Sequence, residues 1–142
     1  MIQTMSLGHA DAQKAIQAIQ TELQRQGKAA VIAVVDAHGE LIALLRLDGA
    51  PLPSILNAMN KAWTAARERK ATRELGQAAR DPQHGFDMAY FGDPRYIGWG
   101  GGLPIVIEGV VVGAVGVSGL PESEDIELAQ IGAQAITGKA DS

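Results

Sequence analysis

The segment that most constrains the fold is GWGGGLPIVIEGVVVGAVGVSG, residues 98–119, which is both glycine-rich and strongly apolar. It holds eight glycines among twenty-two residues, and most of the others are Val, Ile or Leu. Flexible linkers are rich in Gly but polar, whereas strands are rich in β-branched residues and poor in Gly. The segment therefore predicts buried strands whose backbone lies close to either the protein core or a ligand.

The remaining elements follow from apolar spacing and turn residues. Helices are expected to begin after Ser6 and at Ser54, to span residues 72–80, and to begin again near Ser123. Strands are expected at residues 29–35, 40–47, 96–99, 103–107 and 110–118, with an irregular loop over residues 81–95. Short turns join the strands, which makes them antiparallel. The predicted fold class is α+β: one domain, residues 1–142, with a central, mainly antiparallel β-sheet flanked by helices.

Charge and cysteine content exclude several classes of function. The chain has a net charge of -4, a pI near 5.3 and no cysteine. Nucleic acids and anionic membranes do not attract an acidic protein, so neither partner is expected. Disulfides, zinc ribbons and iron–sulfur clusters need cysteine and are ruled out. The first residues lack a signal-peptide pattern, and we expect a cytoplasmic protein.

The glycines of the opening segment divide into two groups. Gly109 fits a two-residue turn, and Gly113 and Gly116 fit a bulge or a close approach by a helix within the last strand. The triplet at residues 100–102 has two interpretations. Its successive N–H groups form a concave site for a carboxylate or phosphate, or the triplet simply lets the chain fold tightly before Pro104.

Polar residues near this triplet are candidates for binding a ligand. If a strand end, a helix face and the glycine loop converge, they form a pocket with a cation, backbone amides and an indole, suited to a planar or carboxylated ligand. The alternative is that the charged side chains simply lie on the solvent-exposed surface and form no pocket. The candidate ligand-binding residues are Arg46, Asp48, Lys61, Trp99, Gly100, Gly101, Gly102 and Ser118.

The three histidines show no spacing typical of a zinc site. His84 lies in the sequence DPQHGFDMAYF, among Phe, Met and Tyr residues. Such surroundings suit a haem-iron ligand or a general base, and they equally suit a loop folded onto its own apolar cluster. His84 and His9 are the candidate ligands for a haem iron.

Several motifs together resemble the GlcG/HbpS family of haem-degrading-domain proteins and the C-terminal domain of PduO-type adenosyltransferases. They are VVDAHG, RLDGAP, KAWTA, GGGLP, VGAVGVSG and ESED, within residues 6–136. The resemblance implies a profilin- or PAS-like fold, homo-oligomers from dimer to octamer, and haem binding or a corrinoid-related role in some members. It also implies that a shared pocket is formed by Asp36, Arg46, Asp48, Lys61, Thr64, Gly100, Gly101, Gly102, Pro104 and Ser118.

These observations favour a small-ligand-binding accessory protein over an enzyme. The expected ligand is haem or a related tetrapyrrole or corrinoid, with a link to glycerol, diol or glycolate catabolism. The alternative is a small enzyme acting on a carboxylated or carbonyl metabolite, with the glycine loop as an oxyanion site and Lys61, Asp48 or His84 as acid or base. A third interpretation is a purely structural assembly partner.

Overall fold

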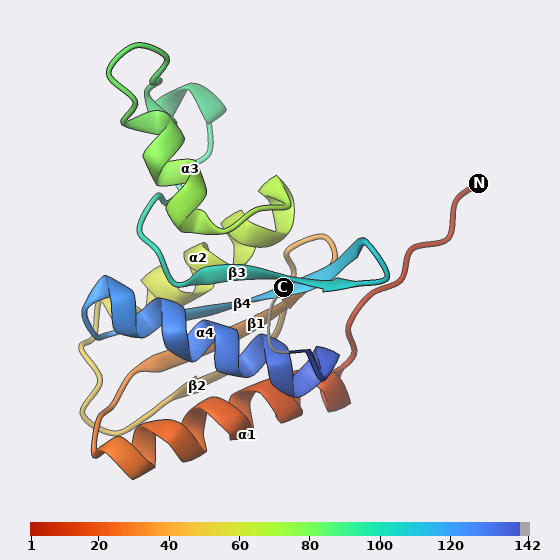
Figure 1. The fold of residues 1–142 in the computed structure, drawn as a ribbon, viewed down its shortest axis with the longest axis vertical. Helices are drawn as coiled ribbons and strands as arrows, with labels where there is room; N and C mark the ends of the chain where they lie inside the picture. Colours follow the sequence, from red (N-terminus) through yellow and green to blue (C-terminus); the bar gives the residue numbers. More distant parts are fainter. Residues whose placement is uncertain (140–142) are drawn as a thin grey trace.

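The computed structural model describes residues 1–139, whose strands form a four-stranded antiparallel sheet in the order β2-β1-β4-β3 (Figure 1). The predicted α+β class is therefore confirmed. The elements are α1 (His9–Gln26), β1 (Val31–Asp36), β2 (Leu41–Arg46), α2 (Ser54–Glu68), α3 (Thr72–Ala79), a 3-10 turn η1 (Met88–Phe91), β3 (Gly102–Ile107), β4 (Val110–Ser118) and α4 (Glu122–Thr137).

Two tight hairpins build the sheet, and their inner strands β1 and β4 pair with each other from Val31↔Ser118 to Asp36↔Gly113. The turn between β3 and β4 has φ of 51° at Glu108 and 78° at Gly109, the positive values that a two-residue hairpin turn requires. Both hairpins agree with the sequence prediction.

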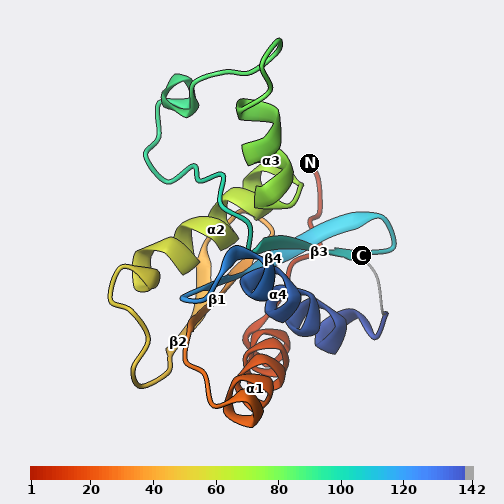
Figure 2. The same ribbon diagram turned by 60° about the vertical axis from the view of Figure 1, so that its left-hand side comes forward.

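Helices cover both faces of the sheet (Figure 2). α1 and α4 lie on one face, where Ile19, Leu23 and Leu128 join the large core cluster. α2 lies on the other face and presents small side chains to the strands. Among them, Ala58 and Ala62 sit directly over β4: a Cβ at Gly116 would lie 2.2 Å from the Ala58 carbonyl oxygen. The predicted close approach of a helix at Gly116 is confirmed.

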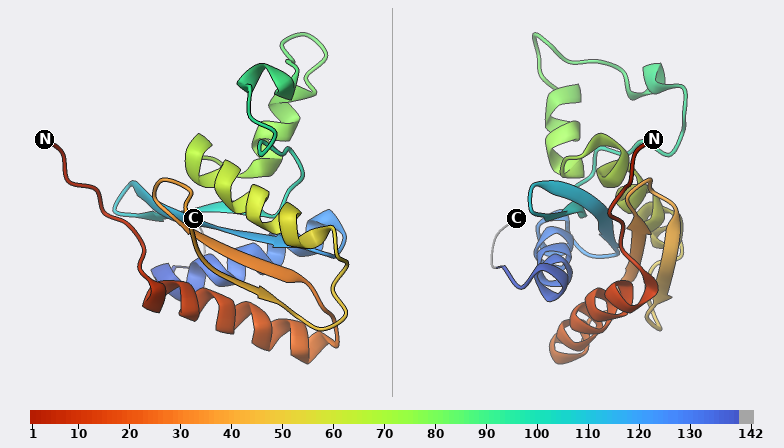
Figure 3. Two further views of the ribbon diagram at one scale, coloured as in Figure 1. Left: turned by 180° about the vertical axis from the view of Figure 1, so that it is seen from behind. Right: turned by 90° about the vertical axis from the view of Figure 1, so that its right-hand side faces the viewer.

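α3 and the chain that follows it project beyond the sheet as an arm, residues 69–99 (Figure 3). The strand expected at residues 96–99 is wrong, because this segment is irregular. The Ile97 N–H donates to Thr64 Oγ1 at 3.2 Å instead of to a neighbouring strand. The backbone of Gly98 packs on that of Gly76 in α3. Contacts with two helices thus replace sheet pairing.

The first helix also begins later than expected. Ser6 does not cap it; its Oγ accepts the Ala37 N–H at 3.0 Å, and α1 starts at His9 after Gly8. None of the helices within residues 1–139 combines the length and apolar character needed to span a bilayer.

Candidate functional site

A buried ion pair joins α2 to α4. Lys61 Nζ lies 3.2 Å from Asp125 Oδ2, and each side chain is 3 % exposed. The same ammonium donates to the Val117 carbonyl oxygen at 3.0 Å, and Asp125 Oδ1 accepts the Leu120 N–H at 3.1 Å. Burial raises the pKa of the Asp125 carboxyl above its ordinary value, while the Lys61 ammonium acts in the opposite direction.

A pocket of about 320 Å³ lies over this ion pair. We call it the lysine pocket. The first turns of α2 and α4, the end of β4 and the glycine loop contribute its walls, which are formed by Pro51, Ser54, Asn57, Lys61, Trp99, Gly100, Ser118, Gly119, Leu120, Glu122 and Asp125. The structure thus brings four of the sequence candidates together: Lys61, Trp99, Gly100 and Ser118.

The other glycines of the loop have a packing role. The Gly102 N–H donates to Thr72 Oγ1 at 3.0 Å, so it already has a buried partner. A Cβ at Gly102 would lie 2.3 Å from the Lys61 carbonyl oxygen, and one at Gly101 would lie 2.5 Å from the Val117 carbonyl oxygen. The tight-folding interpretation therefore accounts for these two positions, which lie beside a different depression next to α3.

Arg46 and Asp48 lie elsewhere. Both are exposed, at the end of β2 and in the turn after it, and neither contributes to the lysine pocket. Asp36, another position that the resemblance implied, uses its Oδ1 to accept the N–H groups of His38 and Glu40 within the first hairpin.

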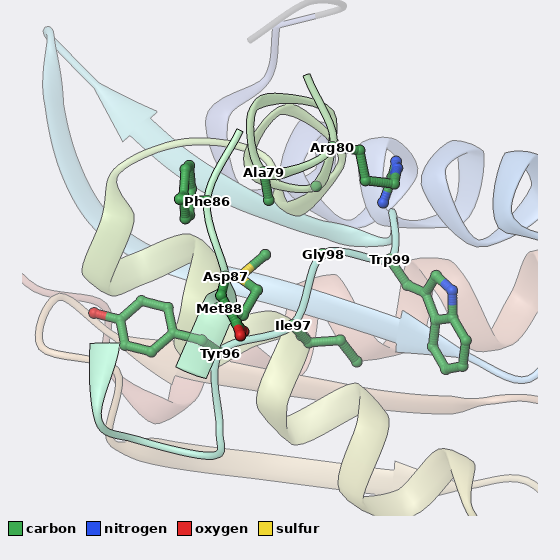
Figure 4. A pocket seen from close by; sticks show the side chains of 10 residues that line it. Ala79, Arg80, Phe86, Asp87, Met88, Tyr96, Ile97, Gly98 and Trp99 are labelled. Atoms are coloured by element: carbon green, nitrogen blue, oxygen red, sulfur yellow. The ribbon is translucent and has the colours of Figure 1, made fainter. Parts of the chain in front are cut away.

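A second hollow of about 460 Å³ lies between α3 and the segment that returns to the sheet (Figure 4). We call it the aromatic groove. Most of its walls are apolar, and it is formed by Gly76, Ala79, Arg80, Phe86, Asp87, Met88, Tyr96, Ile97, Gly98 and Trp99. Trp99 belongs to both hollows and lies across the groove from Phe86 and Tyr96 (Figure 4).

Ring contacts organise the arm around this groove. Phe91 stacks on Tyr96 with ring centroids 3.9 Å apart, and Tyr96 meets Trp63 of α2 edge-on at 5.0 Å. The Arg95 guanidinium lies 4.1 Å from the Trp63 ring centroid and pairs with Asp93 at 2.8 Å. The long loop is thus held against α2 by a continuous chain of contacts.

The two candidate iron ligands are on different parts of the fold. His84 is exposed on the arm, two residues before Phe86, and its backbone N–H donates to Asp81 Oδ1 at 2.8 Å. His9 is exposed at the start of α1, the helix that covers the other face of the sheet from α2 (Figure 1). Within residues 1–139, no three His, Asp or Glu side chains are grouped so that they could hold a metal ion.

Sequence reasoning missed Asp125, which lies in the ESED motif at the start of the last helix and was not among the candidate site residues. Asp125 is 2 % exposed, whereas Glu122 is exposed. Helical spacing could have indicated that Asp125 is buried, because Asp125 shares one face of α4 with the buried residues Ala129 and Gly132.

Comparison with known proteins places most of the chain in one family. Residues 7–134 match the family model described as "Haem degrading protein HbpS-like". An uncharacterized 15.0 kDa protein from the dhaT-dhaS intergenic region of Citrobacter freundii is 34% identical over 121 residues, 85% of each chain. Protein GlcG of Escherichia coli is 36% identical over 104 residues, 72% of this chain and 74% of GlcG.

The corrinoid adenosyltransferase PduO of Salmonella typhimurium is 31% identical over 106 residues. That match covers 75% of this chain but 32% of PduO, so the chain spans about a third of the longer protein.

Solved structures agree with the fold. Klebsiella pneumoniae protein ORFY matches with a TM-score of 0.90 and 30% identity, covering 98% of this chain and 96% of ORFY. PduOC, solved as a complex with haem, matches with a TM-score of 0.85 and 28% identity, covering 93% of this chain and 96% of PduOC.

Proposed function

This chain belongs to the HbpS-like family, as its motifs predicted, and we propose that it is a haem-binding protein. The observation that carries the proposal is the relative that was solved with haem, which matches over nearly the whole of this chain. The aromatic groove is the proposed site, because it is the larger of the two hollows and has the more apolar walls.

The residues of the groove fit a haem. Phe86, Ile97 and Trp99 offer apolar surface to a flat macrocycle, and Arg80 lies beside Trp99 (Figure 4), where a guanidinium can pair with a propionate. The groove is open to solvent along the arm, so it would cover one face of the ring rather than enclose it. Bound haem would supply a redox-active iron, and the chain would supply its axial ligand and its apolar surroundings.

His84 is the proposed iron ligand. It lies on the arm close in sequence to Phe86, and an imidazole is a common axial ligand. The Met88 thioether lies within the groove and is a second side chain of a type that binds haem iron. His9 would hold iron only at a different place, because α1 lies beyond the sheet from the arm (Figure 2).

A hemin titration followed by absorbance tests this proposal. We expect a saturable Soret band that His84→Ala weakens and that His38→Ala, a matched control in the exposed hairpin turn, leaves unchanged. His9→Ala and Met88→Leu show whether another side chain holds the iron. A broad band that none of these changes affects would mean nonspecific partition, and the haem site would be abandoned.

We also propose that the chain forms a homo-oligomer. Leu52, just before α2, is 70% exposed, and Leu56, in the first turn of α2, is 60% exposed. Leu41 on the edge strand is 48% exposed. Large apolar side chains that are exposed on the surface favour association between copies of the chain. Sedimentation velocity on the wild type and on Leu56→Glu would measure the oligomeric state, and a monomeric wild type would contradict the proposal.

A cytoplasmic location and a link to glycerol, diol or glycolate catabolism stay predictions.

A further inference from the structure

We propose that the lysine pocket is a second binding site, separate from the aromatic groove, that takes a small monocarboxylate. The first observation is a pair of serine side chains that are largely buried and line the pocket. Ser54 and Ser118 are each 5% exposed, and both belong to the walls of the pocket. Neither hydroxyl has a hydrogen-bond partner among residues 1–139. Within residues 1–139, Trp63 Nε1 is the one fully buried side-chain polar atom that lacks a partner, so both serine hydroxyls are reached by solvent in the pocket and are available to a ligand.

The buried ammonium adds a third donor. Lys61 has three N–H groups, and within residues 1–139 its acceptors are the Val117 carbonyl oxygen and Asp125 Oδ2. One N–H is therefore left over in a side chain that is 3% exposed and contributes to the pocket. Asp125 Oδ2 already accepts from Lys61, and Asp125 Oδ1 accepts from the Leu120 N–H. The Asp125 carboxylate therefore does not compete with a ligand for the remaining N–H of Lys61.

Two helix N-termini meet at the same place. Ser54 and Asn57 belong to the first turn of α2, whereas Glu122 and Asp125 belong to the first turn of α4. In the described chain no side chain caps the first turn of either helix. The N–H groups of Ser54 and Ile55 donate to the carbonyl oxygens of Pro51 and Leu52, so α2 offers no free donor there. What the two helices contribute at the pocket walls is their positive dipole ends, which favour an anion.

The charges select a monoanion. Lys61 and Asp125 cancel each other, and two helix N-termini together contribute about one positive elementary charge. A single carboxylate matches that charge, whereas a phosphate dianion would leave excess negative charge in a buried site. Glu122 is exposed at the rim, where water screens its charge. Leu120 and Pro51 supply apolar surface for a short carbon chain.

Amide NMR spectra of the labelled full chain, titrated with lactate and separately with inorganic phosphate, test the site. We expect saturable shifts at Ser54, Gly100 and Gly119 with lactate, and weaker binding of phosphate. Ser54→Ala and Ser118→Ala should each weaken lactate binding about tenfold, because each removes one hydrogen bond to a charged group. Glu122→Gln should strengthen it, since it removes a like charge from the rim.

Ser123→Ala is the matched control, because Ser123 is exposed in the same turn of α4 and is not part of the pocket. It should bind lactate as the wild type does, and circular dichroism should show that all variants fold. The proposal is overturned by an absence of saturable shifts, by unchanged binding in both pocket-serine variants, or by phosphate binding more tightly than lactate. The haem proposal is independent, because hemin binding should be unaffected by Ser118→Ala.

Discussion

Lys61 and Asp125 come from helices on opposite faces of the sheet, yet their side chains meet 3.2 Å apart beside the end of β4. The contact passes next to Gly101, where a Cβ would lie 3.0 Å from Lys61 Nζ and 3.1 Å from the Cβ of Asp125. The pair therefore links the two helical layers through a gap that a missing side chain leaves open. One glycine, one lysine and one aspartate thus form a single structural unit.

Removing the cation of this pair should be costly. Lys61→Met leaves Asp125 buried without its counter-charge, and we expect a loss of about 3–5 kcal/mol in the free energy of unfolding. The double variant Lys61→Met/Asp125→Leu should recover most of that loss, because no buried charge remains. Urea unfolding followed by circular dichroism measures both.

Arg25→Ala provides the control for the pair, since Arg25 bonds Glu22 on the surface and its side chain is 70% exposed. That change should cost about 1 kcal/mol or less. A Lys61→Met variant as stable as Arg25→Ala would show that the buried pair contributes little.

Gly101 should tolerate no side chain. Its φ is +123°, and a Cβ there would lie 2.5 Å from the Val117 carbonyl oxygen. Gly101→Ala therefore combines backbone strain with a clash, and we expect a loss of about 3 kcal/mol or more. Gly109→Ala also places alanine at positive φ but meets nothing within 4 Å, so it should cost only about 1–2 kcal/mol. Thermal unfolding measures both variants. If Gly101→Ala and Gly109→Ala lost the same amount of stability, a clash at Gly101 would be ruled out.

The sequence predicted β4 with its observed bounds, residues 110–118, because a Glu-Gly turn and a Ser-Gly pair delimit an apolar run. It failed at residues 96–99, whose composition suits a strand. Their partners are Thr64 and Gly76, which lie far away in the sequence, and local pattern carries no trace of such contacts. The lysine pocket was predicted only in part. Lys61 and Ser118 were candidates as polar residues expected near the glycine triplet, whereas the meeting of two helix N-termini follows only from the fold.

Acid should weaken the fold through two surface carboxylates. The side-chain hydrogen bonds of Arg25 and Arg95 lower the pKa of Glu22 and of Asp93, each to about 2, from ordinary values of 4.5 and 3.8. A carboxyl whose pKa is lower in the folded state favours folding above its unfolded pKa, and this contribution is lost as the pH falls toward 2. We expect the midpoint of urea unfolding to drop between pH 4.5 and pH 2.

The variant Glu22→Gln/Asp93→Asn should show a shallower drop over the same range, because neither side chain can then bind a proton. Replacing the partners instead, with Arg25→Gln/Arg95→Gln, should have a similar effect. An unchanged pH dependence in both variants would assign the acid sensitivity to other groups.

Trp63 should be replaceable by phenylalanine at little cost. Its ring packs against Tyr96 at 5.0 Å and lies under Arg95 at 4.1 Å, but its buried Nε1 has no hydrogen-bond partner among residues 1–139. An unsatisfied buried donor costs about 1–3 kcal/mol, so Trp63→Phe removes a penalty while it loses some packing. We expect a net change within about 1 kcal/mol, against a loss of about 3–5 kcal/mol for Trp63→Ala. Urea unfolding followed by circular dichroism compares them, and a Phe variant as unstable as the Ala variant would show that the indole N–H has a partner in solution.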